Sequence, residues 1–548
     1  DRGRPGGVAS AARVVAGIAP RGVILTASSQ KRGIGLSQPL PDENLLLVSD
    51  FHLGEGWLPE VGGYSRREDF FYDAEFFAFL RYHHAQKEAP RYAGKPWLLI
   101  LNGDTFDFVQ VCKLPPEGPE LEAVCGVSRH AELDRQKRRF GLGSTETESV
   151  WKLRQIAQGH PQFFAALGWF VAVGNRVLFI RGNHDPELHW PQVRAAIGEE
   201  ILRAYLAYAE GEVAAPALTP EMLAGHIAFE PWFYYDGLRQ VYVEHGGQYE
   251  PINHFYDNLN PVLPHRPELL EYPSGLLLTR YVYNRLESIY PYLDNVRPVT
   301  RAVGRILQED PLSGLVVVAR LLRDTVWASL EIQRKHRETR SLLTAPVRPE
   351  ASQGLPAALL EDLAALAQEQ ARFSWQEWER LVLEQGGLVA LALLAVYSGF
   401  KALWALLITE SLRLGMEYVL LAWFAFHAGR TWSALVNDEA NLNYMPRVIG
   451  DILARFRARG VPVRSLILGH THIPERTPLR DAERTTWVVN TGTWVSAEAS
   501  EPFSWETQLA FSRLAAGVPL DTPPEFLVWN AATGEPQLPL LRWAGKRP

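Results

Sequence analysis

Five short clusters of polar residues in this 548-residue chain combine side chains that bind metal ions and transfer protons. They are Asp50-Phe51-His52, Gly103-Asp104, Gly182-Asn183-His184-Asp185, His245, and Gly469-His470-Thr471-His472. Imidazole, carboxylate and amide groups are common ligands of divalent metals, and imidazole also acts as a general acid or base. One such cluster is common by chance. Five in order, each after an apolar segment, indicate a single metal-dependent site.

The spacing within two clusters suggests how they deliver ligands. Residues i and i+2 of an extended chain point the same way, so Asp50 and His52 are expected to offer two ligands on one side. His470 and His472 are expected to do the same. Glycines beside the clusters allow tight backbone turns. These glycines are Gly54, Gly103, Gly182, Gly246 and Gly469.

The number and the chemical type of these ligands predict two metal ions. A single four-coordinate ion needs four ligands, and the clusters supply more. Mixed nitrogen and oxygen ligands favour Mn, Fe, Zn, Co or Ni over Ca, and they leave the identity of the metal open.

Each cluster follows a short segment rich in Val, Ile and Leu, which is typical of a buried strand that ends at a functional loop. The predicted strands are residues 44–49, 97–102, 176–180, 240–244, 465–468 and 486–490. Helical patterns lie between several of them, for instance at 146–167 and 191–208. This alternation predicts an α/β layered domain whose strand ends meet at one rim, where such sheets bind ligands.

The alternation of strands and helices is interrupted once. Between about residues 256 and 463, apolar residues at spacings of three and four with Pro-rich breaks predict helices. The predicted parts are a mobile leader (1–43), the first part of the core (44–255), a helical insertion acting as a lid or membrane-facing element (256–463), and the second part of the core (464–548). The last part is expected to end in a hairpin formed by 526–529 and 538–543.

Composition excludes several classes of protein. The chain is 47% hydrophobic and 21% charged, which is typical of a folded globular protein rather than a disordered or polytopic membrane protein. The formal net charge of −7 makes a nucleic acid an unfavoured partner, because binding would need a local basic groove. Two cysteines, Cys112 and Cys125, cannot form a thiolate zinc site and indicate a reducing compartment.

The ordered set DxH, GD, GNHD, H and GHxH resembles the calcineurin-like metallophosphoesterase superfamily. The match covers residues 44–255 and 464–495, a little under half of the chain. The resemblance implies a four-layer αββα sandwich interrupted by the inserted helical module. It also implies a metallophosphoesterase with a dinuclear metal centre, which hydrolyses a phosphodiester or pyrophosphate bond with a metal-activated hydroxide.

The resemblance further implies a role for each cluster residue. The implied ligands of one ion are Asp50, His52 and His472. The implied ligands of the second ion are Asn183, His245 and His470, and Asp104 is expected to bridge the two. We expect Mn at both positions, with Fe, Zn, Co or Ni as alternatives.

Two residues of the GNHD cluster are assigned to catalysis by the same resemblance. His184 is implied to be a histidine that does not bind metal and protonates the leaving oxygen, and Asp185 is implied to orient it. Residues near the clusters are weaker candidates for substrate or ligand contacts, with a structural role as an equal alternative. They are Asn102, Asp107, Arg181, His189, Gln248, Asn253 and His254. The run 490–494 is interpreted as a packing turn.

The substrate stays open within this reaction class. Serine/threonine protein phosphatases of the superfamily carry GDxxDRG and GNHE, which residues 103–108 and 182–185 do not match. The DFHL opening at residues 50–53 and the GDxFD segment resemble bacterial UDP-2,3-diacylglucosamine hydrolases, which cleave the pyrophosphate of a lipid A precursor. This chain departs from those hydrolases in two ways, because they commonly have Arg at the position of His184 and are much shorter.

The insertion contains an apolar stretch that bears on the substrate. Residues 386–408 carry only one charge, Lys401, and are long enough to span a bilayer. The next charges, at Glu410, Arg413 and Glu417, share one helical face and indicate an amphipathic helix. Three alternatives stay open: a soluble core or lid, helices on a membrane lipid surface, and a spanning hairpin. The expected location is cytoplasmic, and the second alternative would place the protein at the periphery of the inner membrane.

Two other functions are considered. A nuclease on the same scaffold would require a basic groove. A membrane-associated scaffold with little turnover is disfavoured because no ligand position is vacant. The sequence does not indicate the oligomeric state.

Overall fold

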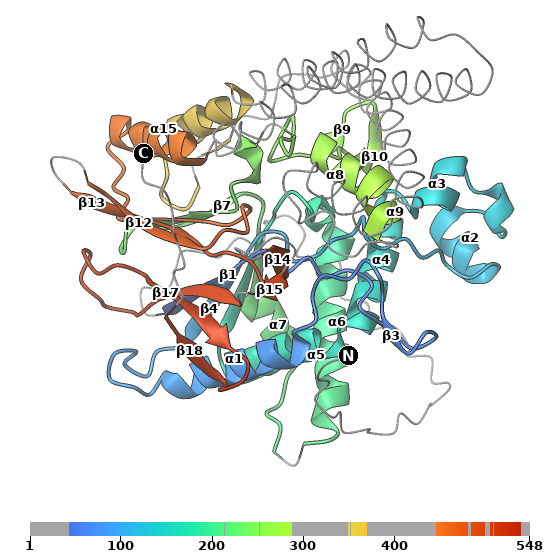
Figure 1. Cartoon of the computed structure of the whole chain (residues 1–548), viewed down its shortest axis with the longest axis horizontal. Coiled ribbons are helices and arrows are strands. Elements are labelled where there is room, and N and C mark those ends of the chain that lie inside the picture. The colour runs from blue at the N-terminus through green and yellow to red at the C-terminus, as the bar shows by residue number, and fades with distance from the viewer. Residues whose placement is uncertain are drawn as a thin grey trace, which may run out of the picture.

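The computed structural model describes residues 43–212, 214–250, 252–287, 349–350, 352–369, 445–480, 484–498, 505–507 and 509–538. Within them the chain forms a mixed α/β fold with two large sheets (Figure 1). The predicted leader, except Glu43, and the apolar stretch at 386–426 lie outside the described residues.

The larger sheet combines strands from the beginning and the end of the chain. In spatial order they are β18 (Glu535–Gln537), β17 (Glu525–Asn530), β16 (Ala510–Leu514), β1 (Asn44–Val48), β4 (Trp97–Asn102), β5 (Arg176–Ile180) and β6 (Ile227–Glu230). The strands β1, β4, β5 and β6 pair in parallel, whereas β16 pairs antiparallel with β1. The carboxyl ends of the four parallel strands therefore point to one edge of the sheet.

The smaller sheet combines strands from both sides of the inserted region. In spatial order they are β12 (Glu475–Arg480), β13 (Thr485–Asn490), β11 (Ser465–Leu468), β8 (Val241–Glu244) and β7 (Phe233–Asp236). The strands β8, β11 and β13 are parallel, and β7 and β12 are antiparallel edges. The segments that precede His245 and His470 are thus direct neighbours.

All six strands predicted from the sequence are present, with bounds within one residue of those expected. The long helix predicted at 146–167 is two helices, α4 (Glu146–Gly159) and α5 (Pro161–Ala172). Pro161 lacks an N–H group and suits the first position of a helix, so α5 starts there instead of continuing α4. The helix α6 (Pro191–Ala209) is as expected. The predicted terminal hairpin is formed by β17 and β18, and its second strand ends at Gln537, before the expected range. Residues 539–543 of that range lie outside the described residues.

An apolar layer between the two sheets holds them together. It includes Leu47, Ile100 and Ile180 of the larger sheet and Val243, Ile467 and Val489 of the smaller one. Because side chains alternate along a strand, the neighbouring residues Leu46 and Leu99 face the helices α1 (Asp73–Gln86), α4, α5 and α6. The smaller sheet is covered by α15 (Met445–Ala458) and by the helical residues 357–369.

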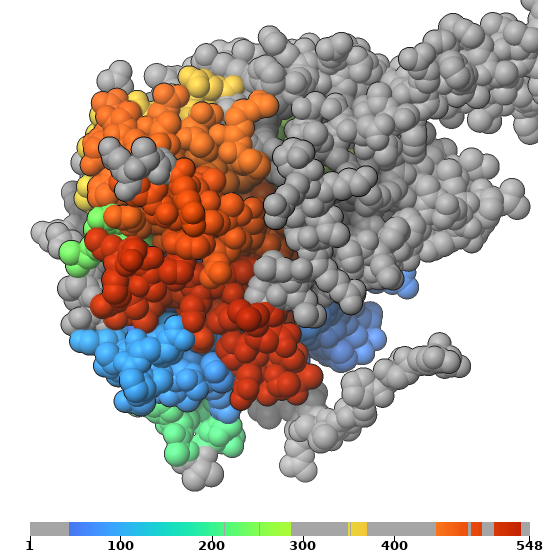
Figure 2. Space-filling model, turned by 60° about the vertical axis from the view of Figure 1, so that its left-hand side comes forward, coloured from blue at the N-terminus to red at the C-terminus, as the bar shows by residue number. Residues whose placement is uncertain are grey.

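Parts of the chain that are distant in sequence share one face of the molecule. Figure 2 shows the C-terminal strands in red between the α15 segment in orange and the N-terminal segment in blue.

The shorter elements are β2 (Trp57–Leu58), β3 (Gly63–Tyr64), α2 (Pro119–Cys125), η2 (His130–Glu132), α3 (Arg135–Phe140), η3 (Pro186–His189), α7 (Pro220–His226), η4 (Gly247–Tyr249), β14 (Ser496–Glu498) and β15 (Trp505–Thr507).

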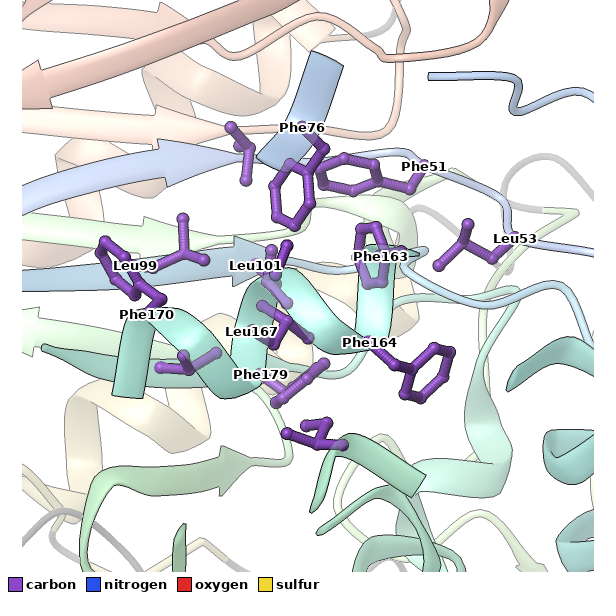
Figure 3. Packing of buried hydrophobic residues seen from close by; sticks show 14 of the residues in the cluster. Phe51, Leu53, Phe76, Leu99, Leu101, Phe163, Phe164, Leu167, Phe170 and Phe179 are labelled. Carbon is purple, nitrogen blue, oxygen red and sulfur yellow. The ribbon is translucent and has the colours of Figure 1, made fainter. Parts of the chain in front are cut away.

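An aromatic cluster anchors the loop after β1 (Figure 3). Phe51 stands between the candidate ligands Asp50 and His52 and is fully buried. Its ring lies 5.2–5.5 Å, between centroids, from the rings of Phe70, Phe76, Phe163 and Trp494. These partners come from α1 and the loop just before it, from α5, and from the turn after β13, so the packing of three distant segments fixes the position of this loop.

The described start of the predicted insertion contains strands as well as helices. The hairpin of β9 (Val262–Leu263) and β10 (Arg266–Leu270) occupies the expected Pro-rich break. It leads into α8 (Ser274–Leu278), the π-helical turn η5 (Thr279–Tyr283) and α9 (Asn284–Glu287).

This segment is bound to loops of the α/β core. Arg280 donates hydrogen bonds to the carbonyl oxygens of Gly141 and Leu142, at 2.7 and 2.6 Å. The side-chain amide of Asn284 donates to the carbonyl oxygen of Val109 at 2.6 Å. None of the described helices combines the length and apolar character needed to cross a membrane.

A buried ion cluster joins α1 and α5 to the loop after β1. His160 is fully buried, with Nδ1 3.1 Å from Asp73 Oδ2 and Nε2 3.3 Å from Glu68 Oε2. Burial alone would lower the pKa of His160, but the carboxylates of Asp73 and Glu68 raise it from 6.5 to about 10. The ring is therefore charged in the folded protein at neutral pH.

Replacing Phe163 by Ala is expected to lower the free energy of unfolding by about 3–5 kcal/mol, because it leaves a cavity among closely packed rings. The measurement is urea-induced unfolding. Leu238→Ala is the control, since Leu238 is 64% exposed and should change the free energy by less than about 0.5 kcal/mol. Equal effects of the two substitutions would contradict the packing described for Phe163.

His160→Gln should destabilise the protein in a pH-dependent way. The folded pKa lies above the unfolded value, so the contribution of the charged ring is complete below pH 6.5 and is lost as the pH rises through about 10. Unfolding free energies of the wild type and the variant, measured across this range, should converge at high pH. A difference that stays constant with pH would refute the assignment.

Candidate metal centre

The structure brings all seven predicted ligands together at the carboxyl ends of five strands. Asp50 and His52 follow β1, Asp104 follows β4, and Asn183 follows β5. From the smaller sheet, His245 follows β8, whereas His470 and His472 follow β11. Three overlapping groups have ligand atoms within 4.8 Å of one another: Asp50 with His52 and His472, His52 with Asp104 and His184, and Asp104 with His245 and His470.

The distances between ligand atoms suit metal coordination. An ion with bonds of about 2.1 Å holds neighbouring ligand atoms about 3.0–3.4 Å apart. His472 Nε2 lies 3.1 Å from His52 Nε2 and 3.4 Å from Asp50 Oδ1. His245 Nε2 lies 3.0 Å from Asn183 Oδ1 and 3.1 Å from Asp104 Oδ2. Both halves of the predicted centre therefore have the spacing of a ligand shell.

The hydrogen bonds of His245 show that a positive charge belongs in the site. Its Nδ1 lies 2.9 Å from the carbonyl oxygen of Asn102. A carbonyl oxygen only accepts hydrogen bonds, so Nδ1 must carry a proton and donate it to this oxygen. Its Nε2 faces two further oxygen atoms, those of Asn183 and Asp104. Burial alone would lower the pKa of His245, but Asp104 raises it to about 10. A second proton or a metal ion must stand between Nε2 and these oxygens, so the residues present fit a metal ion.

The backbone at the ligands adopts a conformation that is unusual for residues other than glycine. Five candidate ligands have positive φ values: Asp50 (57°), His52 (48°), Asp104 (50°), His470 (71°) and His472 (59°). The expectation that the i and i+2 pairs lie in extended segments is therefore wrong, because the left-handed turns themselves aim the side chains. Such strained positions cluster at functional sites.

Glycines allow the ligands to approach the neighbouring backbone. A Cβ atom at Gly103 would lie 2.4 Å from the ring of His245, and one at Gly247 would lie 2.3 Å from Asn183 Oδ1. A Cβ atom at Gly182 would lie 2.1 Å from Asp104 Oδ1. Gly103 also has a φ of 82° and turns the chain, as expected, whereas Gly182 is needed for close contact rather than for its backbone angles.

Asp104 is fixed in the charged form at the centre of the site. It is 1% exposed, and its Oδ1 accepts a hydrogen bond of 2.7 Å from the backbone N–H of His184. Burial alone would raise the pKa of Asp104, but the imidazoles of His245, His184 and His52 hold it well below the usual value. Its Oδ2 lies 3.1 Å from His245 Nε2 and 3.8 Å from His52 Nε2, which places this carboxylate between the two ligand groups.

His184 is oriented by Asp107, which corrects the expectation that Asp185 does so. The Nδ1 of His184 lies 2.7 Å from Asp107 Oδ2, and the side chain is 18% exposed. Asp185 instead accepts hydrogen bonds from the backbone N–H groups of Gly182 (2.6 Å) and Thr105 (2.9 Å). Burial and the nearby Asp104 raise the pKa of Asp185. Its carboxyl group ties the two ligand loops together.

The weaker candidates separate into two sets: residues that contact the predicted ligands or His184, and residues that contact other parts of the chain. Asn102 and Asp107 contact site residues through a backbone carbonyl and a carboxylate. Arg181 donates to the carbonyl of Asn258, and Gln248 donates to Glu244 Oε2 at 2.7 Å. His254 Nδ1 lies 3.2 Å from the carbonyl oxygen of Gln248, and the rings of His189 and Trp190 are 5.5 Å apart. In the run 490–494, Trp494 is fully buried in the aromatic cluster.

Sequence reasoning missed one residue of the site. Glu250 Oε2 lies 2.6 Å from Nε2 of the candidate ligand His470. Glu250 stands in a loop after β8 with no motif around it, so its type and position gave no signal.

Comparison of the chain with protein-family models gives no match, and comparison with curated proteins gives none.

Replacing Gly182 by Ala should disrupt metal binding, because the added Cβ would overlap Asp104 Oδ1. We expect loss of bound Mn²⁺ in equilibrium dialysis followed by elemental analysis. Gly198→Ala in α6 is the matched control, because its Cβ position has no neighbour within 4 Å apart from the backbone of its own helix. That control should keep its metal and gain roughly 0.5–1 kcal/mol of stability. Normal metal content in Gly182→Ala would show that the contact is not needed.

Proposed function

We propose that the protein is a metal-dependent phosphoesterase of the calcineurin-like metallophosphoesterase superfamily. It hydrolyses a phosphodiester or pyrophosphate bond with two divalent ions, Mn²⁺ in the first instance. The observation that carries the proposal is the position of Asp104 between two groups of ligands. One group contains Asp50, His52 and His472, and the other contains Asn183, His245 and His470.

The fold supports this proposal. Helices cover the outer face of each sheet, and an apolar layer lies between the sheets. We propose that this arrangement is the four-layer αββα sandwich of the superfamily. The site lies at the carboxyl ends of parallel strands, where open α/β sheets bind their ligands.

The residues around the two ligand groups suit phosphoryl transfer. Divalent ions bound there would neutralise phosphoryl oxygens and acidify a water molecule. The chain itself supplies His184, whose Nδ1 is held by Asp107 while the partly exposed ring leaves Nε2 as the proton donor. Protonation of a leaving oxygen in this way is usually worth about 10²–10⁴ in rate.

The substrate class follows the sequence resemblance. A pyrophosphate or diester within a lipid-linked nucleotide would suit both the DFHL and GDxFD segments and an apolar insertion at a membrane lipid surface. A nuclease is distinguished by turnover of DNA or RNA and by binding that falls steeply with salt. A scaffold is distinguished by the absence of turnover with every divalent ion.

The central test is hydrolysis of bis-p-nitrophenyl phosphate by protein stripped of metal and reloaded with Mn²⁺. His184→Ala should keep its metal and lose about 10²–10⁴ in kcat, because proton donation is lost while the ligands remain. Hydrolysis of the monoester is measured in parallel. Turnover of His184→Ala equal to that of the wild type would remove His184 from the mechanism.

Asp104→Ala should lose both turnover and metal, because the two ligand groups lose the carboxylate between them. Elemental analysis of the purified variant measures the loss. Glu132→Ala is a suitable control, because Glu132 lies on the surface with its carboxylate paired to Arg129. Full metal content in Asp104→Ala would contradict the proposed bridge.

A further inference from the structure

Glu250 forms a short contact with one candidate ligand. Its Oε2 lies 2.6 Å from Nε2 of His470, and the two side chains are 15% and 6% exposed. A hydrogen bond to a charged oxygen at this distance, largely shielded from water, is among the stronger kinds in proteins.

Glu250 itself belongs to none of the ligand groups found among the described residues. His470 forms such a group with Asp104 and His245, whereas Glu250 does not join it despite touching His470. An imidazole carries its two nitrogens on different edges of the ring. Because Nε2 is directed to Glu250, Nδ1 is the nitrogen left to serve as the ligand atom of His470 in that group.

We infer that Glu250 is a positioning residue, which fixes the tautomer and orientation of His470 so that Nδ1 binds the second metal ion. This inference rests on the proposed function and deepens it. A carboxylate that accepts the proton of a ligating imidazole holds the ring in place and makes it a stronger ligand.

A chain of contacts holds Glu250 itself. The side-chain amide of Asn253 donates a hydrogen bond of 2.6 Å to the same Oε2. Asn253 packs against α8, since a Cβ atom at Gly275 would lie 2.2 Å from Asn253 Oδ1. The N–H of Gly275 donates to the carbonyl oxygen of Ile252 at 2.7 Å. The first helix after β10 therefore sets the position of a carboxylate that orients a metal ligand.

The test is Mn²⁺ binding to the full-length, metal-free protein, followed by calorimetry and by electron paramagnetic resonance of the spin-coupled pair. Glu250→Ala should weaken the binding of one Mn²⁺ by about 10- to 100-fold and leave the other unchanged. The spectrum should then change from a coupled pair to a single Mn²⁺ at low loading. Glu250→Gln keeps an acceptor for the ring N–H, so it should lose less.

Glu268→Gln is the control in the same segment, because Glu268 is 57% exposed. The melting temperatures of the metal-free variants establish that they fold. If Glu250→Ala does not fold, Glu250→Gln carries the test, with a measurable loss of affinity for one ion as the supporting result.

A double-mutant cycle separates positioning from a direct or general effect. In a His470→Ala background, Glu250→Ala should cause no further loss of affinity, because the ring that Glu250 holds is absent. Unchanged affinity in the single variant, or a full additional loss in the double variant, would overturn the inference alone. A wild-type protein that binds no divalent ion would overturn the proposed function as well.

Discussion

The candidate site depends on the burial of two carboxylates at the junction of the sheets. Asp50 and Asp104 are 0% and 1% exposed, and a buried charge without compensation is strongly unfavourable. Their surroundings consist of imidazoles and backbone N–H groups, including those of His470 and His184. The left-handed turns at the ligands, and the glycines that leave room beside them, bring these groups into contact with the two carboxylates. A cation between the imidazoles and carboxylates completes the same compensation.

The sequence predicted the strands and the ligand types because both depend on local properties. Continuous Val, Ile and Leu segments mark strands buried on both faces. The side-chain type alone identifies Asp50 and His472 as possible metal ligands. The details that failed depend on the path of loops in space. Asp185 adjoins His184 in sequence, yet Asp107 holds its ring. The glycine contacts and Glu250 join segments that no local pattern connects.

The inserted region is continuous with the α/β core where the structure describes it. The π-helical turn carrying Arg280 is bonded to carbonyls at 141 and 142, and α15 supplies the helical cover of the smaller sheet. Insertion between β8 and β11 is tolerated because the entropy of closing a loop grows only with the logarithm of its length, by about 0.6 kcal/mol for each doubling. Parallel neighbours need a crossover connection in any case.

The contact between His52 and His472 joins positions 420 residues apart. During synthesis, the chain therefore emerges with β1, β4 and β5 in place long before β11 and the antiparallel strands β16 to β18 can complete both sheets. Such long-range pairing is slow to form. Until then, the edge of β1 that β16 later covers stays unpaired and open to association with other chains. The same connectivity means that a chain cut short before β11 lacks two imidazoles of the candidate site, so the full set of predicted ligands exists only once synthesis has passed His472.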